Sequence, residues 1–264
     1  MNTDEIILRK EGGIATLTLN RPKKFNAMTT DMWRHLPTLI QEVSDDDSLK
    51  VLILTGAGRA FCAGSDAGRL ASRIAGEKIE KTQKELTTPI GAEVFSLARL
   101  EKPTIAVING VAAAAGISIA LACDIRIVSE QARFVLSWVK MGLIPDGGST
   151  YFLTRLLGPS KTLELAFTGN SIGAAEAERI GLVNRVVPHE DLMTVAKELA
   201  TAIAQGPPIA IQLMKRAVYR ALLHDLESQL DFESYAQGIC RQTEDHQEGV
   251  QAFIQKRKPE FKGK

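Results

Sequence analysis

The 264-residue chain is poor in the side chains that build metal centres and disulfide frameworks. It contains 4 histidines and 3 cysteines, and the cysteines are Cys62, Cys123 and Cys240. No histidine or cysteine group has the spacing of zinc ligands, and an odd number of scattered cysteines is typical of a reduced protein. We therefore expect no metal site, and we expect the protein to be cytoplasmic.

Other function classes are disfavoured by what the sequence lacks. No apolar run approaches the length of a membrane span, and the first residues have no apolar signal core. The formal net charge of +1 gives no support to nucleic-acid binding. Gly56-Ala57-Gly58 lacks the Lys-Ser/Thr ending of a phosphate loop, and no G-x-S-x-G elbow is present. We expect neither nucleic acid nor a membrane among the partners.

Short apolar segments alternate with helical patterns along most of the chain, which predicts an α/β fold. Residues 6–9 and 14–19 read as a hairpin, and further strands are predicted at 51–55, 60–66, 104–108, 125–129, 132–136 and 182–187. Helices are predicted at 30–43, 112–122, 149–157, 160–167 and 173–179, and at one or two places within 67–101. From about residue 192 the chain is predicted to be largely helical. We place an α/β core at residues 1–200 and a helical region at 201–264.

The stretch 102–124 is the centre of the predicted site. A buried strand turns at Asn109-Gly110 and enters an Ala-rich helix whose first turn includes Ala115. Unpaired N–H groups of such a turn, with the Ser65 N–H beside them, can hold a negative charge developing on oxygen. The alternative is a buried core helix with no chemical role.

Asp146 is the acidic residue with the most unusual context. It stands between Pro145 and Gly147-Gly148, and Trp138, Leu143 and Ile144 are expected to surround it with an apolar pocket. Its carboxylate either takes part in catalysis or caps the helix that begins near Ser149. Trp138 belongs either to the core or to the site.

Several motifs, spread in order over essentially the whole chain, resemble the enoyl-CoA hydratase/isomerase (crotonase) superfamily. They are Asn20-Arg21-Pro22 with Asn26-Ala27, residues 60–66, 102–124 and 142–148, Ala175-Glu176-Ala177 with Gly181-Leu182-Val183, residues 248–253, and Lys256-Arg257-Lys258-Pro259. The resemblance implies a spiral of ββα units with a C-terminal helical trimerisation region. It also implies a homotrimer or a dimer of trimers, and an acyl-CoA thioester ligand. Coenzyme A is then part of the substrate and no separate cofactor is expected. In this family two backbone N–H groups form the oxyanion hole, and by motif position they belong to Ser65 and Ala115.

The departures from the family pattern indicate the reaction. The glutamates that family hydratases use fall on Ser118 and Trp138, so addition of water is not expected. Family isomerases keep one carboxylate where Asp146 stands, and the Pro-Asp-Gly-Gly context looks most like the branch that includes the phenylacetate-pathway ring-epoxide isomerase. We expect an enoyl-CoA isomerase that shifts a C=C bond from the 3-enoyl to the 2-enoyl position, with Asp146 carrying the proton.

Two other interpretations remain open. Family 4-chlorobenzoyl-CoA dehalogenases use an Asp as nucleophile, with a Trp eight residues earlier, which matches Asp146 and Trp138; an acyl-CoA thioester hydrolase is a related possibility. The expected histidine is missing from 67–101, however, and Pro replaces Asn before the Asp. The other interpretation is a non-catalytic acyl-CoA-binding trimer. The expected substrate-binding residues are Ala63, Asp66, Lys23, Lys24, Trp138 and Ser118.

Overall fold

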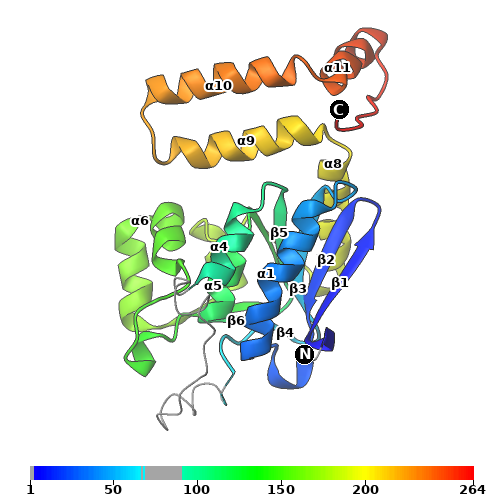
Figure 1. The fold of residues 1–264 in the computed structure, drawn as a ribbon. Coiled ribbons are helices and arrows are strands. Elements are labelled where there is room, and N and C mark those ends of the chain that lie inside the picture. Colours follow the sequence, from blue (N-terminus) through cyan, green and yellow to red (C-terminus); the bar gives the residue numbers. More distant parts are fainter. Residues whose placement is uncertain (1–2, 67, 69–90) are drawn as a thin grey trace.

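The computed structural model describes residues 3–66, 68 and 91–264, and it has an α/β architecture (Figure 1). One sheet has six strands in the order β1-β2-β3-β5-β7-β10, and a smaller sheet has four in the order β4-β6-β8-β9. The strands are β1 (Ile6–Glu11), β2 (Ile14–Leu19), β3 (Val51–Gly56), β4 (Ala60–Cys62), β5 (Thr104–Ile108), β6 (Val111–Ala113), β7 (Ile125–Ser129), β8 (Arg133–Val135), β9 (Ser171–Gly173) and β10 (Arg185–Val187). The helices are α1 (Thr30–Asp45), α4 (Ala92–Arg99), α5 (Ala115–Leu121), α6 (Ser149–Thr168), α7 (Ala174–Arg179), α8 (Leu192–Ala204), α9 (Pro208–Ala221), α10 (Leu226–Cys240) and α11 (Glu244–Gln255).

The larger sheet begins with the predicted hairpin and continues with parallel strands. β1 and β2 pair antiparallel in a register that runs from Ile6 opposite Leu19 to Glu11 opposite Ile14. Between these strands Gly12 and Gly13 take φ values of +57° and +80°, which glycine adopts without steric cost. β2, β3, β5, β7 and β10 then pair parallel with their neighbours. The hairpin and the three central strands were all predicted from the alternation of apolar segments.

A strand–strand–helix unit repeats along the chain. In the pairs β3/β4, β5/β6 and β7/β8, the first strand joins the larger sheet and the second joins the smaller one. β6 leads directly into α5, and β8 leads through a short 3₁₀ turn, η3 (Val139–Met141), to α6. The second strand of each pair therefore lies in the smaller sheet, and after β6 and β8 the described chain continues into a helix. This is the spiral of ββα units that the family resemblance implied.

Both faces of the larger sheet are covered, as is usual for parallel strands. All six positions of β3 are buried, and successive side chains point to opposite faces. Leu52 and Leu54 belong to a cluster with residues of α1, α4 and α5, while Val51 and Ile53 belong to a cluster with residues of α8. Because α8 covers the sheet as far as Ala204, the predicted boundary at residue 200 falls inside a helix of the core.

Helices α9 and α10 form a separate layer at one end of the core, with α11 beside them (Figure 1). α9 starts after Gly206-Pro207 and is fastened to the core by Asp124. That carboxylate accepts hydrogen bonds from Lys215 Nζ at 2.7 Å and from Tyr219 Oη at 2.9 Å. It also accepts from the backbone N–H of Thr104 at 2.8 Å. The predicted C-terminal helical region is present.

The structure corrects several predicted elements. The helix predicted at 112–122 begins only at Ala115, because Val111–Ala113 pairs as β6 and Ala114 turns the chain with a φ of +43°. The helices predicted at 149–157 and 160–167 form α6, which is interrupted by the non-helical Gly158. The strand predicted at 182–187 covers only Arg185–Val187, and β9 was not predicted. Most of the helical segment predicted at 67–101 lies outside the described residues, and its described end is α4. No helix among the described residues is both long and apolar enough to cross a membrane.

Candidate active site

Two turns from different ββα units meet in the smaller sheet. One follows β4 and contains Gly64 and Ser65; the other joins β6 to α5 at Ala114. A Cβ atom added to Gly64 would lie 3.0 Å from the Ala113 carbonyl oxygen and 3.5 Å from the Ala115 nitrogen. Gly64 also has a φ of +92°. Glycine is therefore required here on two counts, and the two turns lie in direct contact.

The N–H group of Ser65 points away from the neighbouring chain segment. Met28 donates its N–H to the Gly64 carbonyl at 2.7 Å, and Asp66 donates its N–H to the Met28 carbonyl at 3.0 Å. Since the C=O and N–H of one trans peptide unit point in opposite directions, the Ser65 N–H lies on the side opposite Met28. Within the described residues no backbone carbonyl accepts a hydrogen bond from it.

The N–H group of Ala115 is available for the same kind of contact. Ala115 is the first residue of α5, so its N–H has no partner within the helix. The N–H of Ala114, by contrast, donates to the Val135 carbonyl at 3.1 Å, so the first-turn donors that the sequence suggested do not include it. A Cβ atom on Gly116 would overlap the Cys62 carbonyl oxygen, which shows how closely α5 starts against the end of β4. The Ser65 and Ala115 N–H groups thus belong to adjoining turns.

Asp146 lies in the loop before α6 and does not cap that helix with its side chain. The N-cap residue of α6 is Gly148, which has no side-chain cap. The Asp146 carboxylate instead accepts a hydrogen bond from Trp138 Nε1 at 3.1 Å, and Trp138 is only 2% exposed. The capping alternative considered from the sequence is therefore wrong, and Trp138 is both a core residue and the partner of Asp146.

Ser118 holds the Asp146 loop against α5. Its hydroxyl donates to the Asp146 carbonyl at 3.1 Å and shares a 2.8 Å hydrogen bond with the Ser149 hydroxyl, and both serines are fully buried. Ser118 follows Ala115 by three residues, just under one helical turn and about 4.5 Å along the axis. The loop that carries Asp146 is therefore held about one turn from the Ala115 N–H. Ser149 was not identified from the sequence, where it reads only as a residue at a helix start.

The apolar pocket expected around Asp146 is only partly present among the described residues. Trp138 is buried beside it, but Leu143 is 53% exposed and Ile144 is 80% exposed. The reason is that η3 ends in Gly142 and the chain then runs along the surface until α6 begins. Asp146 itself is exposed.

The basic loop after β2 lies beside the Ser65 turn. Lys23 and Lys24 are exposed on the 3₁₀ turn η2 (Pro22–Lys24). The Phe25 carbonyl accepts a hydrogen bond from the Ala63 N–H at 2.9 Å, which joins this loop to the residues after β4. The structure thus brings together Lys23, Lys24 and Ala63.

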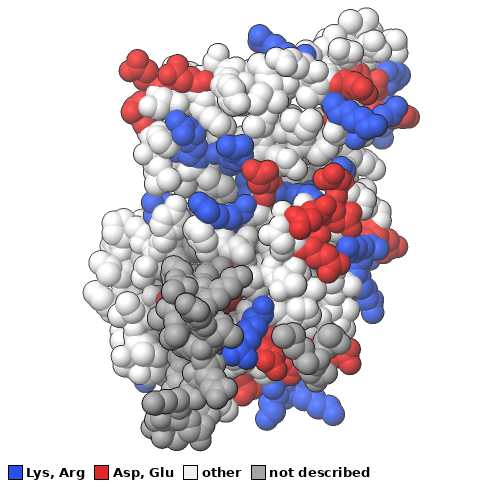
Figure 2. Space-filling view, in the orientation of Figure 1, with Lys and Arg blue, Asp and Glu red and all other residues white. Residues whose placement is uncertain are grey.

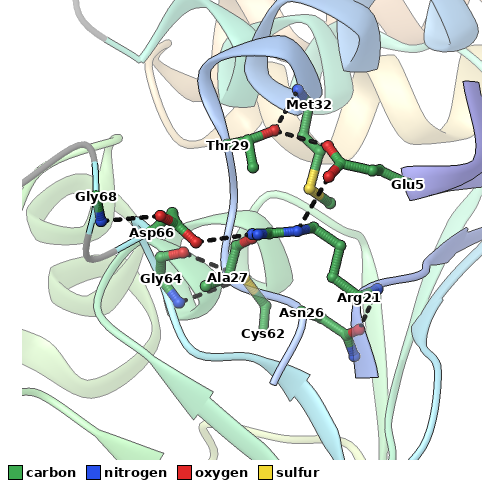
Figure 3. Close-up of polar contacts among 10 residues, drawn as sticks. All are labelled: Glu5, Arg21, Asn26, Ala27, Thr29, Met32, Cys62, Gly64, Asp66 and Gly68. Carbon is green, nitrogen blue, oxygen red and sulfur yellow. Dashed lines mark hydrogen bonds and ion pairs between the residues drawn. The ribbon is translucent and has the colours of Figure 1, made fainter. Parts of the chain in front are cut away.

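Asp66 is already engaged by protein groups (Figure 3). Its carboxylate pairs with Arg21 Nη1 at 2.9 Å and accepts the Gly68 N–H at 2.9 Å. These contacts, the Arg21 hydrogen bond first, lower the pKa of Asp66 below its usual value. Arg21 also pairs with Glu5 at 3.1 Å, so it lies between two carboxylates. Asp66 therefore shapes the turn that carries Ser65.

Asn26 is a further structural residue of this region that sequence reasoning noted only as part of a motif. It is fully buried with a φ of +56°. Its Oδ1 accepts the Arg21 N–H at 2.9 Å, and its Nδ2 donates to the carbonyls of Ala57 and Ala60 at 2.9 and 2.7 Å. Asparagine tolerates left-handed backbone conformations, and this tolerance is the signal that could have identified it. Asn26 fixes the basic loop next to β4.

Comparison with known proteins agrees with this geometry. Residues 9–264 match the family described as enoyl-CoA hydratase/isomerase. The short-chain-enoyl-CoA hydratase of Clostridium acetobutylicum is 42% identical over 264 residues, and the match covers 98% of each chain. The 1,2-epoxyphenylacetyl-CoA isomerase of Escherichia coli is 38% identical over 265 residues, again with 98% of each chain covered. A crystal structure of enoyl-CoA hydratase from Bacillus anthracis superimposes with a TM-score of 0.90 at 34% identity, covering 98% of this chain and all of that one.

The match spans both sheets, the turns of Ser65 and Ala115 and the C-terminal helices, and it comes from sequence and structure alike. This protein is a member of the enoyl-CoA hydratase/isomerase family.

Proposed function

We propose that the protein is an enoyl-CoA isomerase that converts a 3-enoyl-CoA into the conjugated 2-enoyl-CoA. The observation that carries this proposal is the placement of the Asp146 carboxylate. It is oriented by Trp138 Nε1, and its loop is fixed to α5 about one turn from the Ala115 N–H. One carboxylate is sufficient for a proton shift along an acyl thioester when two N–H groups, here without a backbone partner among the described residues, polarise the thioester carbonyl.

In the proposed mechanism the thioester carbonyl accepts hydrogen bonds from the Ser65 and Ala115 N–H groups. This polarisation acidifies the C–H bond next to the carbonyl, and Asp146 removes that proton. The electron pair moves through the conjugated system onto the carbonyl oxygen, giving a dienolate that the two N–H groups stabilise. Asp146 then returns the proton two carbons further along, which restores the enzyme and moves the double bond. A donor of this kind contributes roughly 10²–10³-fold in rate.

The same placement argues against hydration as the main reaction. By the family resemblance, the positions that hold glutamates in family hydratases correspond to Ser118 and Trp138, and neither side chain can act as a general base. Both side chains are hydrogen-bonded to Asp146, Ser118 through the main chain and Trp138 through the carboxylate. In this proposal they act through Asp146 and position it at the substrate. The relatives include both hydratases and an isomerase, so the assay below has to separate the two reactions.

The test is a spectrophotometric assay with a 3-enoyl-CoA that follows the absorbance of the conjugated 2-enoyl thioester. We expect wild type to convert the substrate, and Asp146→Asn to lose roughly 10²–10⁴-fold in kcat because the general base is gone. Asp231→Asn, which changes an exposed acid on α10, is the matched control and should keep full activity. Full activity of Asp146→Asn would refute the proposal, as would rapid hydration of a 2-enoyl-CoA by wild type.

A second candidate function is supported by the hydrogen bond between Trp138 Nε1 and Asp146 Oδ1. A carboxylate fixed in this way can also attack a substrate carbon as a nucleophile, as in a 4-chlorobenzoyl-CoA dehalogenase or a thioester hydrolase. Incubation of wild type with 4-chlorobenzoyl-CoA separates the candidates, because a dehalogenase releases chloride and a hydrolase releases free CoA. If acyl-CoA binds and no reaction occurs in any assay, the protein is an acyl-CoA-binding protein without catalysis.

For coenzyme A we propose that Lys23 and Lys24 bind its phosphates, with Ala63 beside them. The two lysines are exposed on η2, next to the turn that carries Ser65, so phosphates and thioester would reach adjacent loops. Replacing both lysines with Ala should weaken CoA binding measured by calorimetry, and more so at low salt because the charges are exposed. Replacing exposed Arg185 and Lys197 with Ala controls for the loss of two charges. An affinity equal to that of the control would contradict the assignment.

We also propose that the C-terminal helices assemble the chain into a homotrimer or a dimer of trimers. They expose large apolar side chains that monomers usually bury, among them Met214 (63%), Val218 (62%), Tyr235 (67%), Phe253 (86%) and Ile254 (72%). Sedimentation equilibrium should give a mass of three or six chains. A stable monomer at micromolar concentration would contradict this part of the proposal.

A further inference from the structure

A concave region lies where the C-terminal helices meet the core. It has a volume of about 400 Å³ and is lined by the end of α4 and the residues after it, the first turn of α6, the second half of α9 and the segment after it, and one residue of α10. Figure 2 shows Lys and Arg side chains gathered along this boundary between the helical layer and the core. None of the residues assigned to the proton transfer lines this pocket.

The lining carries more positive than negative charge. Arg99, Arg216 and Arg220 line it together with His224, and Glu101 is the one acidic residue of the described lining. Glu101 lies 4.0 Å from Arg216 and is 61% exposed, so it neutralises little of this charge. Lys215 also lines the pocket, but its charge is balanced by Asp124 at 2.7 Å. At least two guanidinium charges therefore have no carboxylate partner within the described lining.

Aromatic rings support these guanidinium groups. Arg216 and Arg220 lie over the ring of Phe232, with centroid distances of 5.9 and 5.3 Å. Arg99 lies over Phe95 at 4.5 Å. The Nε of Arg220 is buried without a hydrogen-bond partner among the described atoms. A guanidinium stacked on a ring keeps its N–H edge available, and that edge matches the two oxygens of a carboxylate or phosphate.

The pocket is connected to the Asp146 loop by two elements of the core. A Cβ atom on Gly91, the N-cap of α4, would lie 3.1 Å from Gly147 Cα, and Leu100 at the other end of α4 lines the pocket. Nine residues of helix correspond to about 14 Å. Tyr151, in the first turn of α6, also lines the pocket. The pocket is thus lined by residues of the two helices that begin at the Asp146 loop, and its Leu100 side lies about one α4 length, about 14 Å, from that loop.

We propose that this pocket binds an oxyanion, a carboxylate or a phosphate, and that its position fits the carboxylate at the distal end of an acyl chain. An extended ten-carbon chain is about 11 Å long at roughly 1.2 Å per bond. This length is comparable to the distance of about 14 Å along α4. The assignment to the acyl chain rests on the proposed acyl-CoA function. The oxyanion chemistry of the pocket does not, because a free phosphate would satisfy the same arginines.

The test compares two ligands that differ only at the distal end. Calorimetric titrations use sebacyl-CoA, which ends in a carboxylate, and decanoyl-CoA, which ends in a methyl group. Three proteins are compared: wild type, a double variant of the pocket (Arg99→Gln and Arg216→Gln), and a control double variant (Arg133→Gln and Arg185→Gln). The control removes two exposed arginines outside the pocket. In parallel, inorganic phosphate is added to each protein and the shift in melting temperature is measured.

We expect the Arg99→Gln, Arg216→Gln protein, the pocket variant, to bind sebacyl-CoA roughly tenfold more weakly than wild type. This factor corresponds to the loss of one charge-assisted hydrogen bond. Its binding of decanoyl-CoA should be unchanged. The control should behave as wild type with both ligands. If sebacyl-CoA is not favoured but phosphate raises the melting temperature of wild type and not of the pocket variant, the site is confirmed with a free anion as its ligand. If neither ligand distinguishes the pocket variant from the control, the proposal is refuted. Failure of wild type to bind either acyl-CoA would instead reject the proposed function, and the phosphate titration would still decide the pocket.

Discussion

The hydroxyl pair of Ser118 and Ser149 provides a direct test of how the Asp146 loop is held. The two hydroxyls lie 2.8 Å apart, both residues are fully buried, and Ser118 also donates to the Asp146 carbonyl at 3.1 Å. Ser118→Ala removes both contacts and leaves the Ser149 hydroxyl buried without its partner. Leaving a buried polar group unsatisfied costs about 1–3 kcal/mol of unfolding free energy. Ser149→Ala should cost less, about 0.5–1.5 kcal/mol, since the Ser118 hydroxyl keeps its hydrogen bond to the Asp146 carbonyl.

The double variant should cost less than the sum of the two single variants, because no serine is then left without its partner. Urea denaturation of the four proteins gives the coupling energy, and for residues in direct contact it should be at least about 0.5 kcal/mol. The three variants, which lack the hydrogen bond between the two hydroxyls, should also have a lower kcat than wild type for the proposed isomerisation, because Asp146 is then less well positioned. Additive costs within about 0.3 kcal/mol would show that the two hydroxyls do not interact, and the positioning argument would be refuted.

Two further predictions concern packing and pH. Gly116→Ala places a methyl group on the Cys62 carbonyl and should lower the free energy of unfolding by about 1–3 kcal/mol, measured by thermal denaturation. The control Gly173→Ala, whose new methyl group meets no atom within 4 Å, should be nearly neutral. Equal effects of the two substitutions would contradict the close approach of α5 to β4. The pKa of Glu248 is lowered from 4.5 to about 2, chiefly because Arg257 donates a side-chain hydrogen bond to it. A lowered folded-state pKa means that this stabilisation is complete above pH 4.5 and is lost as the pH falls toward 2, so the C-terminal tail should become protease-sensitive in that range. Glu248→Gln should abolish this pH dependence, and an unchanged pH profile of cleavage would exclude the Glu248–Arg257 pair as its cause.

The elements predicted well are those with strong local signals. The hairpin has its Gly12-Gly13 turn, and β3 and β5 are continuous apolar runs, so periodicity and turn chemistry were sufficient. β9 was missed because its three residues are a strand only through pairing with β8. The start of α5 was placed too early for a similar reason, since Val111–Ala113 joins the smaller sheet although alanine favours a helix.

The site shows the same division. The strand-to-helix stretch at 102–124 and the Ser65 N–H pointed to a site for negative charge on oxygen, and an isolated Asp in a Pro-Gly loop pointed to chemistry. The sequence left open whether Asp146 caps α6 and whether Trp138 is only a core residue. Those questions depend on where the loop before α6 lies, and no local pattern contains that information.

The sequence by itself determined the fold class, the order of the units and the family, because these follow from motifs and periodicities that are written along the chain. The tertiary structure decided which groups meet: Ser65 beside Ala115, Trp138 on Asp146, Ser118 on Ser149, and the arginines of α4 and α9 around one pocket. Apart from Trp138 and Asp146, which are eight residues apart, these partners are separated by more than thirty residues, and the pairing of strands and the docking of helices bring them together. The sequence thus shows which chemical groups are available for the site, and the tertiary structure determines the distances between them.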